Sequence, residues 1–147
     1  MNPSGPCFEF GPRGYFSLEP SYTARKKMKL LGVFSGFYEQ ALVFDATGKV
    51  WRASQLRSRH KKSWWLTLLV HTVFNPWVDV EISWDQPRQF QLEELKDLYL
   101  RAVDQDDDIL TQFVDAPELK KKIKEAESFD DLVRVYRWMQ SDHSNEE

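Results

Sequence analysis

Acid–base or nucleophilic catalysis needs a base that a neighbouring group holds in place, and histidine is the usual base. The chain of 147 residues has three histidines. His143 lies in an acidic tail and His60 in a basic connector, so we expect water to surround both. His71 ends the apolar run Trp64–Val70, and we expect it to be a buried core histidine. The alternative interpretation is that His71 lines a ligand or enzyme pocket.

Cys7 is the single cysteine, and its nearest basic neighbour in the sequence is Arg13. A reactive thiolate needs positive charge beside it, so we expect this thiol to be inert. One cysteine also excludes an internal disulfide and a cysteine cluster for zinc. The sequence has no nucleophile motif, no glycine-rich phosphate loop and no paired metal-ligating histidines. We therefore expect a protein that needs no cofactor and is not an enzyme, and the alternative function is a small-ligand or enzymatic module with a pocket near His71.

The acidic run that follows residue 103 almost forms a calcium-binding loop. Asp104, Asp106 and Asp108 have the spacing of the first, third and fifth ligands, and Asp115 falls at the twelfth position. The loop requires glycine at its sixth position, where this chain has Ile109, and normally glutamate at the twelfth. These two departures predict no metal site. We expect the carboxylates to precede a helix, because they stabilise its positive N-terminal end.

A basic connector follows the predicted strand 49–54. Positive charges for phosphates and aromatic rings for stacked bases are the ingredients of a nucleic-acid surface. The pI of about 5.7 is low for such a protein, and charged connectors are common for solubility alone. Nucleic-acid binding is therefore an alternative function, through Arg52, Arg57, Arg59, Lys61, Lys62 and Trp64.

Charge is unevenly distributed along the chain, whose net charge is −3. Residues 28–65 carry seven positive and two negative charges, whereas residues 66–147 carry nine positive and nineteen negative charges. This asymmetry indicates either an interaction face or a basic sheet that packs beside acidic helices. The chain is 41% hydrophobic and 14% aromatic, and this composition excludes a chain that is disordered over its whole length. No apolar run is long enough to cross a bilayer. We expect a soluble cytoplasmic protein that does not use a membrane.

Two-residue alternation and apolar runs predict strands over the first part of the domain. The segment 45–48, Asp-Ala-Thr-Gly, has the residues of a type I turn closed by glycine and so predicts a hairpin. Along 77–84, valine and isoleucine occupy one face, whereas Trp77, Asp79 and Glu81 occupy the other. The predicted strands are Lys29–Tyr38, Ala41–Phe44, Lys49–Ser54, Trp64–Phe74 and Trp77–Trp84, and 14–19 could add an edge strand.

The apolar period then lengthens to about 3.6 residues, which predicts helices. Asp115 followed by Pro117 marks a helix start, and Ser128 with Asp131 resembles a capping box. The predicted helices cover 91–103, 109–114, 117–126 and 129–139. Strands followed by helices predict an α+β fold, with an antiparallel β-meander of about five strands and three to four C-terminal helices packed on one sheet face.

Residues 1–27 hold seven of the thirteen glycine and proline residues. This composition predicts a mostly irregular N-terminal extension, and Met28 is an alternative start of the protein. We expect a single α+β domain over 28–139 and a flexible acidic tail over 140–147.

The function expected from these observations is protein–protein contact by a small non-enzymatic protein. By analogy of size and charge, it would be an inhibitor or immunity-type protein that neutralises a basic partner. An exposed Trp77 beside carboxylates would suit such a contact, and the alternative is that helices cover both sheet faces and bury Trp77. The expected contact residues are Asp104, Asp106, Asp107, Asp108, Trp77, Asp79 and Glu81.

Overall fold

The structure is a computed structural model, and it describes residues 1–11, 15–22, 25–34, 36, 40–58, 63–72, 74–105 and 114–141. Its strands are β1 (Cys7–Phe10), β2 (Phe16–Glu19), β3 (Arg25–Lys29), β4 (Leu42–Asp45), β5 (Lys49–Ser58), β6 (Trp77–Trp84) and β7 (Arg88–Gln89). Its helices are α1 (Leu30–Phe34), α2 (Trp64–Thr72), α3 (Leu92–Asp104), α4 (Ala116–Glu125) and α5 (Phe129–Ser141). The predicted α+β class is confirmed, because α3, α4 and α5 follow an antiparallel sheet.

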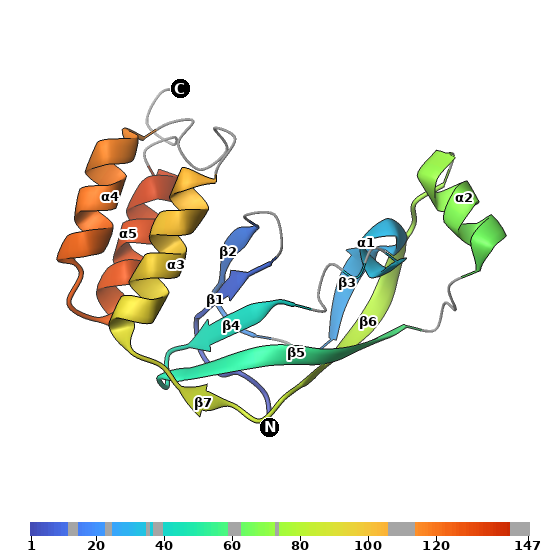
Figure 1. The fold of residues 1–147 in the computed structure, drawn as a ribbon, viewed down its shortest axis with the longest axis horizontal. Helices are drawn as coiled ribbons and strands as arrows, with labels where there is room; N and C mark the ends of the chain where they lie inside the picture. The colour runs from blue at the N-terminus through green and yellow to red at the C-terminus, as the bar shows by residue number, and fades with distance from the viewer. Residues whose placement is uncertain are drawn as a thin grey trace.

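The strands form one antiparallel sheet in the order β2-β1-β4-β5-β6-β3, and β7 pairs with the first residues of β5. β5 is the longest strand, and its register with β6 shifts between Ala53 and Gln55. Such a bulge bends a strand and increases its twist. β5 therefore joins a proximal half of the sheet, with β2, β1 and β4, to a distal half, with β6 and β3 (Figure 1).

Helices α3, α4 and α5 cover one face of the proximal half (Figure 1). Phe8 and Phe10 of β1 lie in the core on this face, and Phe16 of β2 joins them. The ring of Tyr99 in α3 lies 4.5 Å from that of Phe16 and 5.8 Å from that of Phe8, measured between centroids. Buried aromatic rings of this kind stabilise a fold by about 1.5–3 kcal/mol each.

The prediction that residues 1–27 are mostly irregular is wrong where β1 and β2 lie. β1 pairs with both β2 and β4, so it is an inner strand of the sheet. Pro6 and Gly11 flank this strand without interrupting it, and the alternating phenylalanines outweigh the turn-forming composition. The edge strand predicted within 14–19 is confirmed as β2, which lies at the end of the strand order.

The hairpin between β4 and β5 forms as predicted and is organised by the buried Asp45 carboxylate. Its Oδ1 accepts hydrogen bonds from the Thr47 amide at 2.9 Å, the Thr47 hydroxyl at 2.6 Å and the Lys49 amide at 3.1 Å. Its Oδ2 accepts the indole N–H of Trp51 at 2.7 Å. Gly48 has φ of +84°, the left-handed conformation that closes the turn. The side chain of Asp45 thus links the turn to the sheet face on which Trp51 is buried.

The distal half has a core of its own, under the short helices α1 and α2. Val78, Val80 and Ile82 of β6 are buried there, as the alternation predicted. The other face of β6, with Trp77 and its acidic neighbours, is exposed, so the interpretation in which helices cover both faces is wrong.

Two apolar segments predicted as strands are helical. The range predicted as Lys29–Tyr38 holds the last residue of β3 and then α1, after which Gly36 adopts φ of +68°. A glycine in this conformation is a common helix end. In the run Trp64–Phe74, predicted as a central strand, residues Trp64–Thr72 form α2. Its polar residues recur every four positions, the helical period, and Ser63 begins the helix by accepting the Leu66 amide on its hydroxyl at 3.4 Å.

The helices predicted at 91–103, 117–126 and 129–139 are confirmed as α3, α4 and α5. The predicted caps form: Asp115 accepts the Glu118 amide at 3.3 Å, and the Ser128 hydroxyl accepts the Asp131 amide at 3.1 Å. The predicted helix 109–114 lies outside the described residues except for Val114, and the tail is described only to residue 141.

Lys96 of α3 is buried although it is charged. Its ammonium group donates to the backbone carbonyls of Lys124 at 2.7 Å and Ala126 at 3.1 Å, and to the Glu93 carboxylate at 3.1 Å. A positive charge is favourable at the carbonyl end of a helix. Lys96 therefore ties α3 to the end of α4.

Candidate functional site

Large hydrophobic side chains are exposed at the distal end of the molecule. Within the described residues, the only others of this kind are Met1 and Tyr15. Exposed large apolar side chains gathered at one end of a molecule are typical of a contact site. We call these five residues the apolar end: Trp64 (82% exposed), Trp65 (57%), Leu68 (59%), Phe74 (57%) and Trp77 (63%).

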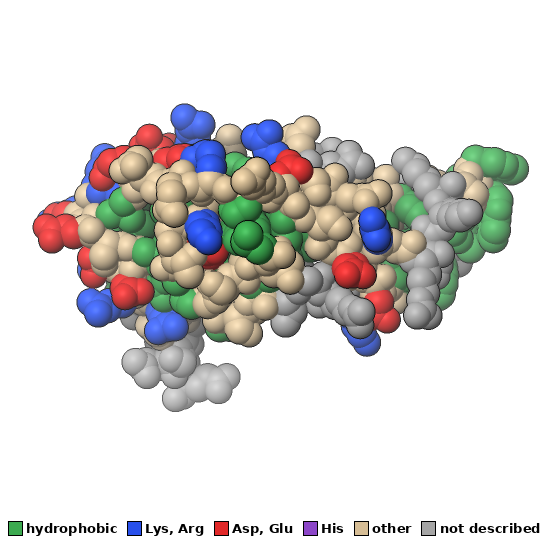
Figure 2. All heavy atoms as spheres, turned by 90° about the horizontal axis from the view of Figure 1, so that it is seen from below, with side chains coloured by type: hydrophobic (Ala, Val, Ile, Leu, Met, Phe, Trp, Pro, Cys, Tyr) green, Lys and Arg blue, Asp and Glu red, His purple; other side chains and the backbone are tan. Residues whose placement is uncertain are grey.

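The apolar end arises because α2 is apolar on both sides. Val70 is buried in the distal core and Leu66 packs against it, whereas Trp64, Trp65 and Leu68 face outward. A surface helix normally presents polar residues on its outer side. Figure 2 shows hydrophobic side chains gathered over α2 at this end. The outer face of α2 therefore lacks the polar cover that water requires.

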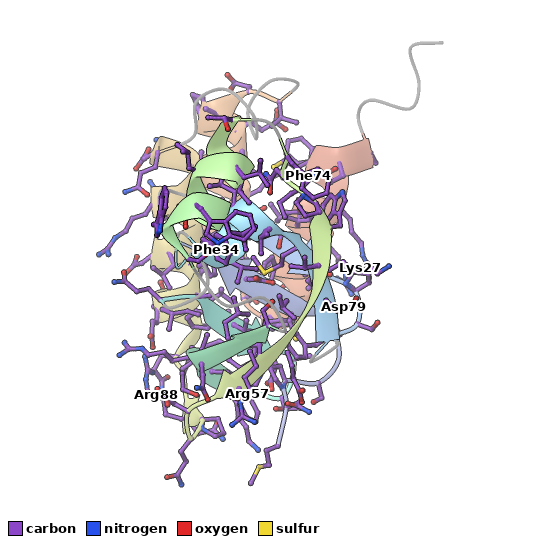
Figure 3. All side chains as sticks on the ribbon, turned by 90° about the vertical axis from the view of Figure 1, so that its right-hand side faces the viewer. Lys27, Phe34, Arg57, Phe74, Asp79 and Arg88 are labelled. Carbon is purple, nitrogen blue, oxygen red and sulfur yellow. The ribbon has the colours of Figure 1, made fainter. Side chains whose placement is uncertain are left out.

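Phe74 and Trp77 are held in the same region by backbone hydrogen bonds. The Phe74 amide donates to the Leu69 carbonyl of α2 at 3.0 Å. The Leu30 amide of α1 donates to the Pro76 carbonyl at 2.9 Å, which fixes the start of β6. Figure 3 looks onto this end and labels Phe74, which lies where the chain passes from α2 to β6. The exposed rings thus sit on a preformed frame.

Trp77 is bordered by basic residues of β3. The Lys29 ammonium nitrogen lies 4.9 Å from the centroid of the Trp77 ring, a cation–π contact. Lys29 stands opposite Trp77 in the sheet register, and the same ammonium group donates to the Asn75 carbonyl at 3.2 Å. The most exposed ring of β6 therefore has a positive charge placed against it.

The acidic residues beside Trp77 also face basic residues. Lys27 stands directly opposite Asp79, and the two are labelled side by side in Figure 3. Glu81 stands opposite Arg25 of β3 on one side and Arg57 of β5 on the other. Opposite charges at such positions attract one another. The structure thus brings the predicted residues Trp77, Asp79 and Glu81 onto one exposed face, but basic neighbours offset their carboxylates.

Asp104, the one residue of the predicted acidic cluster that the structure describes, does not join this face. Asp104 ends α3, far from β6 in Figure 1, and its carboxylate forms an ion pair with Lys120 of α4. Asp106, Asp107 and Asp108 lie outside the described residues. Their predicted role in binding stays a prediction.

The residues predicted to bind nucleic acid are only partly described. Arg52 and Arg57 are exposed on β5, one before and one after its bulge, and Trp64 is exposed on α2. Arg52 borders a cleft of about 310 Å³ together with Asp85 and other residues. Arg59, Lys61 and Lys62 lie outside the described residues.

The two residues considered for catalysis, His71 and Cys7, lie in different elements, α2 and β1. His71 belongs to α2, so it does not lie in a central strand as predicted, and its side chain is not among those described. Cys7 is fully buried, and its thiol donates to the Gly5 carbonyl at 3.3 Å. Within the described ranges, no three His, Cys, Asp or Glu side chains are grouped so that they could hold a metal ion.

Sequence reasoning missed Trp65, Leu68 and Phe74 as surface residues, because it placed the run 64–74 inside the sheet. The four-residue spacing of Ser63, Thr67 and His71 is the signal that could have revealed a helix. A helix of nine residues at the end of a small domain cannot bury all its sides, so this spacing would have indicated exposed apolar residues.

No family model, curated protein or solved structure matches this chain. Among the helices of the described residues, none has the length and apolar character to span a membrane.

Proposed function

We propose that this protein acts by protein–protein contact and that a partner protein covers the apolar end. The observation that carries this proposal is the exposure of five large hydrophobic side chains at one end of the molecule. Three of the five are tryptophans, the residue type most typical of interface hot spots. The proposal keeps the class of function expected from the sequence and moves its contact surface to α2 and the start of β6.

The exposed area is large enough for a specific interface. An aromatic side chain has roughly 150–250 Å² of surface, so the apolar end exposes on the order of 600 Å². A standard interface buries about 800 Å² on each partner. At about 25 cal/mol per Å², burial of the apolar end would release on the order of 15 kcal/mol, against an association cost of about 4–15 kcal/mol. A stable complex is therefore within reach once flanking polar contacts are added.

The frame beneath the apolar end lowers the cost of binding. The tryptophans lie on a helix and a strand, and hydrogen bonds to α1 and α2 hold the segment between them. Preorganised side chains lose less conformational entropy when they bind.

The test uses Trp64→Gln with Leu68→Gln, which removes exposed apolar surface without touching the buried face of α2. Tyr15→Gln, an exposed aromatic residue on the proximal half, is the matched control. Proteins from source-cell extract that bind the wild type with and without nuclease are identified, purified and titrated calorimetrically against each variant. We expect the double variant to bind at least tenfold more weakly and the control to bind as the wild type does.

An unchanged Kd for the double variant would contradict the proposed surface. Loss of the complex on nuclease treatment would instead favour the alternative function, nucleic-acid binding. The role as an inhibitor or immunity-type protein for a basic partner stays a prediction. The identity and charge of the purified partner would test it.

A further inference from the structure

We infer, on the basis of the proposed function, that the partner presents an acidic surface around an apolar centre. The first observation is in the sequence around the apolar end. No acidic residue occurs between Asp45 and Asp79, a stretch that contains the whole apolar end and six lysine or arginine residues. Of these six basic residues, Arg57 is the one that the structure places beside the distal half of the sheet, where it stands opposite Glu81.

The sheet beside the apolar end adds to this charge. β3 contributes four basic residues and the end of β5 contributes Arg57, whereas β6 contributes only the carboxylates of Asp79 and Glu81. The register places Lys26 opposite the buried Val80, so the face that bears Trp77 has Arg25, Lys27, Lys29 and Arg57 against Asp79 and Glu81, an excess of two positive charges. Lys27, Lys29 and Arg57 are exposed, so a bound partner could reach their charges.

The position of Lys29 places this charge within the apolar end itself. Its ammonium group lies over the ring of Trp77, so a partner that covers this ring also approaches the ammonium. Excluding water strengthens the interaction of that charge with its surroundings. An acidic group on the partner would be attracted there, and a basic group would be repelled.

These charges favour an acidic protein over the other occupants. A second copy of the chain, docked through the same end, would bring two positively charged faces together. A basic partner would meet the same repulsion. An anionic lipid surface would attract the lysines, but it would also face the carboxylates of Asp79 and Glu81, which lie on the same side of β6 as Trp77. A protein can place separate charges opposite each of these groups.

The test is a selection of random displayed peptides on the full-length protein, immobilised through a C-terminal tag at low salt. We expect the selected peptides to combine acidic residues with aromatic or aliphatic ones. Their affinities are then measured for Lys27→Glu with Arg57→Glu and for a control with the same change in net charge, Lys121→Glu with Lys124→Glu on α4. We expect the first variant to bind roughly tenfold more weakly and the control to bind as the wild type does.

The outcomes separate this inference from the proposed function. Peptides that require Trp64 and Leu68 but lack acidic residues, or that ignore the Lys27 and Arg57 reversal, would overturn the acidic partner and leave the contact surface intact. Peptides that bind equally well to the Trp64→Gln/Leu68→Gln variant would overturn the surface as well. Binding only to phosphatidylserine vesicles, or self-association in sedimentation experiments that these two substitutions abolish, would overturn the acidic partner, because each identifies another occupant of the apolar end.

Discussion

Removal of the Asp45 carboxylate should strongly destabilise the fold. The side chain is 1% exposed, and its two oxygens accept four hydrogen bonds, of which the one from the Trp51 indole is itself buried. In Asp45→Ala, water can reach the exposed turn and replace some of the lost partners there, but the buried indole N–H keeps none. Hydrogen bonds to charged groups contribute about 1.5–3 kcal/mol, and a buried donor without a partner costs about 1–3 kcal/mol. We expect a loss of about 3–5 kcal/mol in the free energy of unfolding.

Asp45→Asn should have an intermediate effect, because an amide has one accepting oxygen in place of two. If that oxygen serves the turn at Thr47 and Lys49, the amide NH₂ group faces the Trp51 indole donor, and the loss should be about 1–3 kcal/mol. Urea unfolding followed by circular dichroism measures the order wild type, Asn, Ala. Free energies of both variants within about 0.5 kcal/mol of the wild type would refute the role given to this carboxylate.

Three further predictions concern the rest of the fold. Lys96→Met should lower the free energy of unfolding by about 2–4 kcal/mol, because it leaves the carbonyls of Lys124 and Ala126 without their buried donor. Chemical denaturation measures this, and a variant that unfolds at the same denaturant concentration as the wild type would contradict it. The Arg88 guanidinium lowers the pKa of Glu94 by hydrogen bonding, so this pair stabilises the fold above about pH 4.3 and the effect is lost as the pH falls through the lower folded-state pKa. Because the pair is partly exposed, Glu94→Gln should remove less than about 1 kcal/mol at pH 7 and nothing at pH 2, and an equal loss at both pH values would refute the linkage. A chain that starts at Met28 should lack cooperative thermal unfolding. It loses three buried phenylalanines that together contribute roughly 5–9 kcal/mol to the free energy of unfolding. A sharp thermal transition in the shortened chain would show that β1 and β2 are dispensable.

The elements that sequence reasoning predicted correctly carry local signals. The β4–β5 hairpin follows from the Asp45–Gly48 turn, and α4 and α5 follow from their capping residues. In each case a few neighbouring residues determine the backbone conformation. The alternation in β6 is equally local, because one buried face is enough to make it visible.

The segments that were predicted wrongly carry weaker signals, and in α2 the only one is the four-residue spacing of Ser63, Thr67 and His71. An amphipathic pattern appears only when a helix has one polar side, and α2 has an apolar inner face and an apolar outer face. The apolar outer face of α2 hides the amphipathic pattern, and the same face makes the helix a candidate site. α1 is a single short turn region after β3, where composition favours strand and helix equally.

The candidate site itself was predicted only in part. Alternation placed Trp77 on the face of β6 that holds Asp79 and Glu81 and left open whether helices bury it, and the structure shows this face exposed. The basic residues opposite Asp79 and Glu81 were not foreseen, because β3 precedes β6 by about fifty residues and no local pattern shows that the two strands pair. Charge complementarity between distant strands depends on their register, which the chain acquires only when it folds.

The central claim is that a partner protein covers the apolar end, and the indole signals of the six tryptophans test it most directly. In a ¹H–¹⁵N spectrum of the labelled protein, titrated with the purified partner or a selected peptide, we expect the indole signals of Trp64, Trp65 and Trp77 to shift. The Trp51 indole, buried and bonded to Asp45, should stay in place and serves as the internal control. Saturable binding that leaves all three exposed indoles unmoved and instead shifts residues of α3, α4 and α5 would contradict the account.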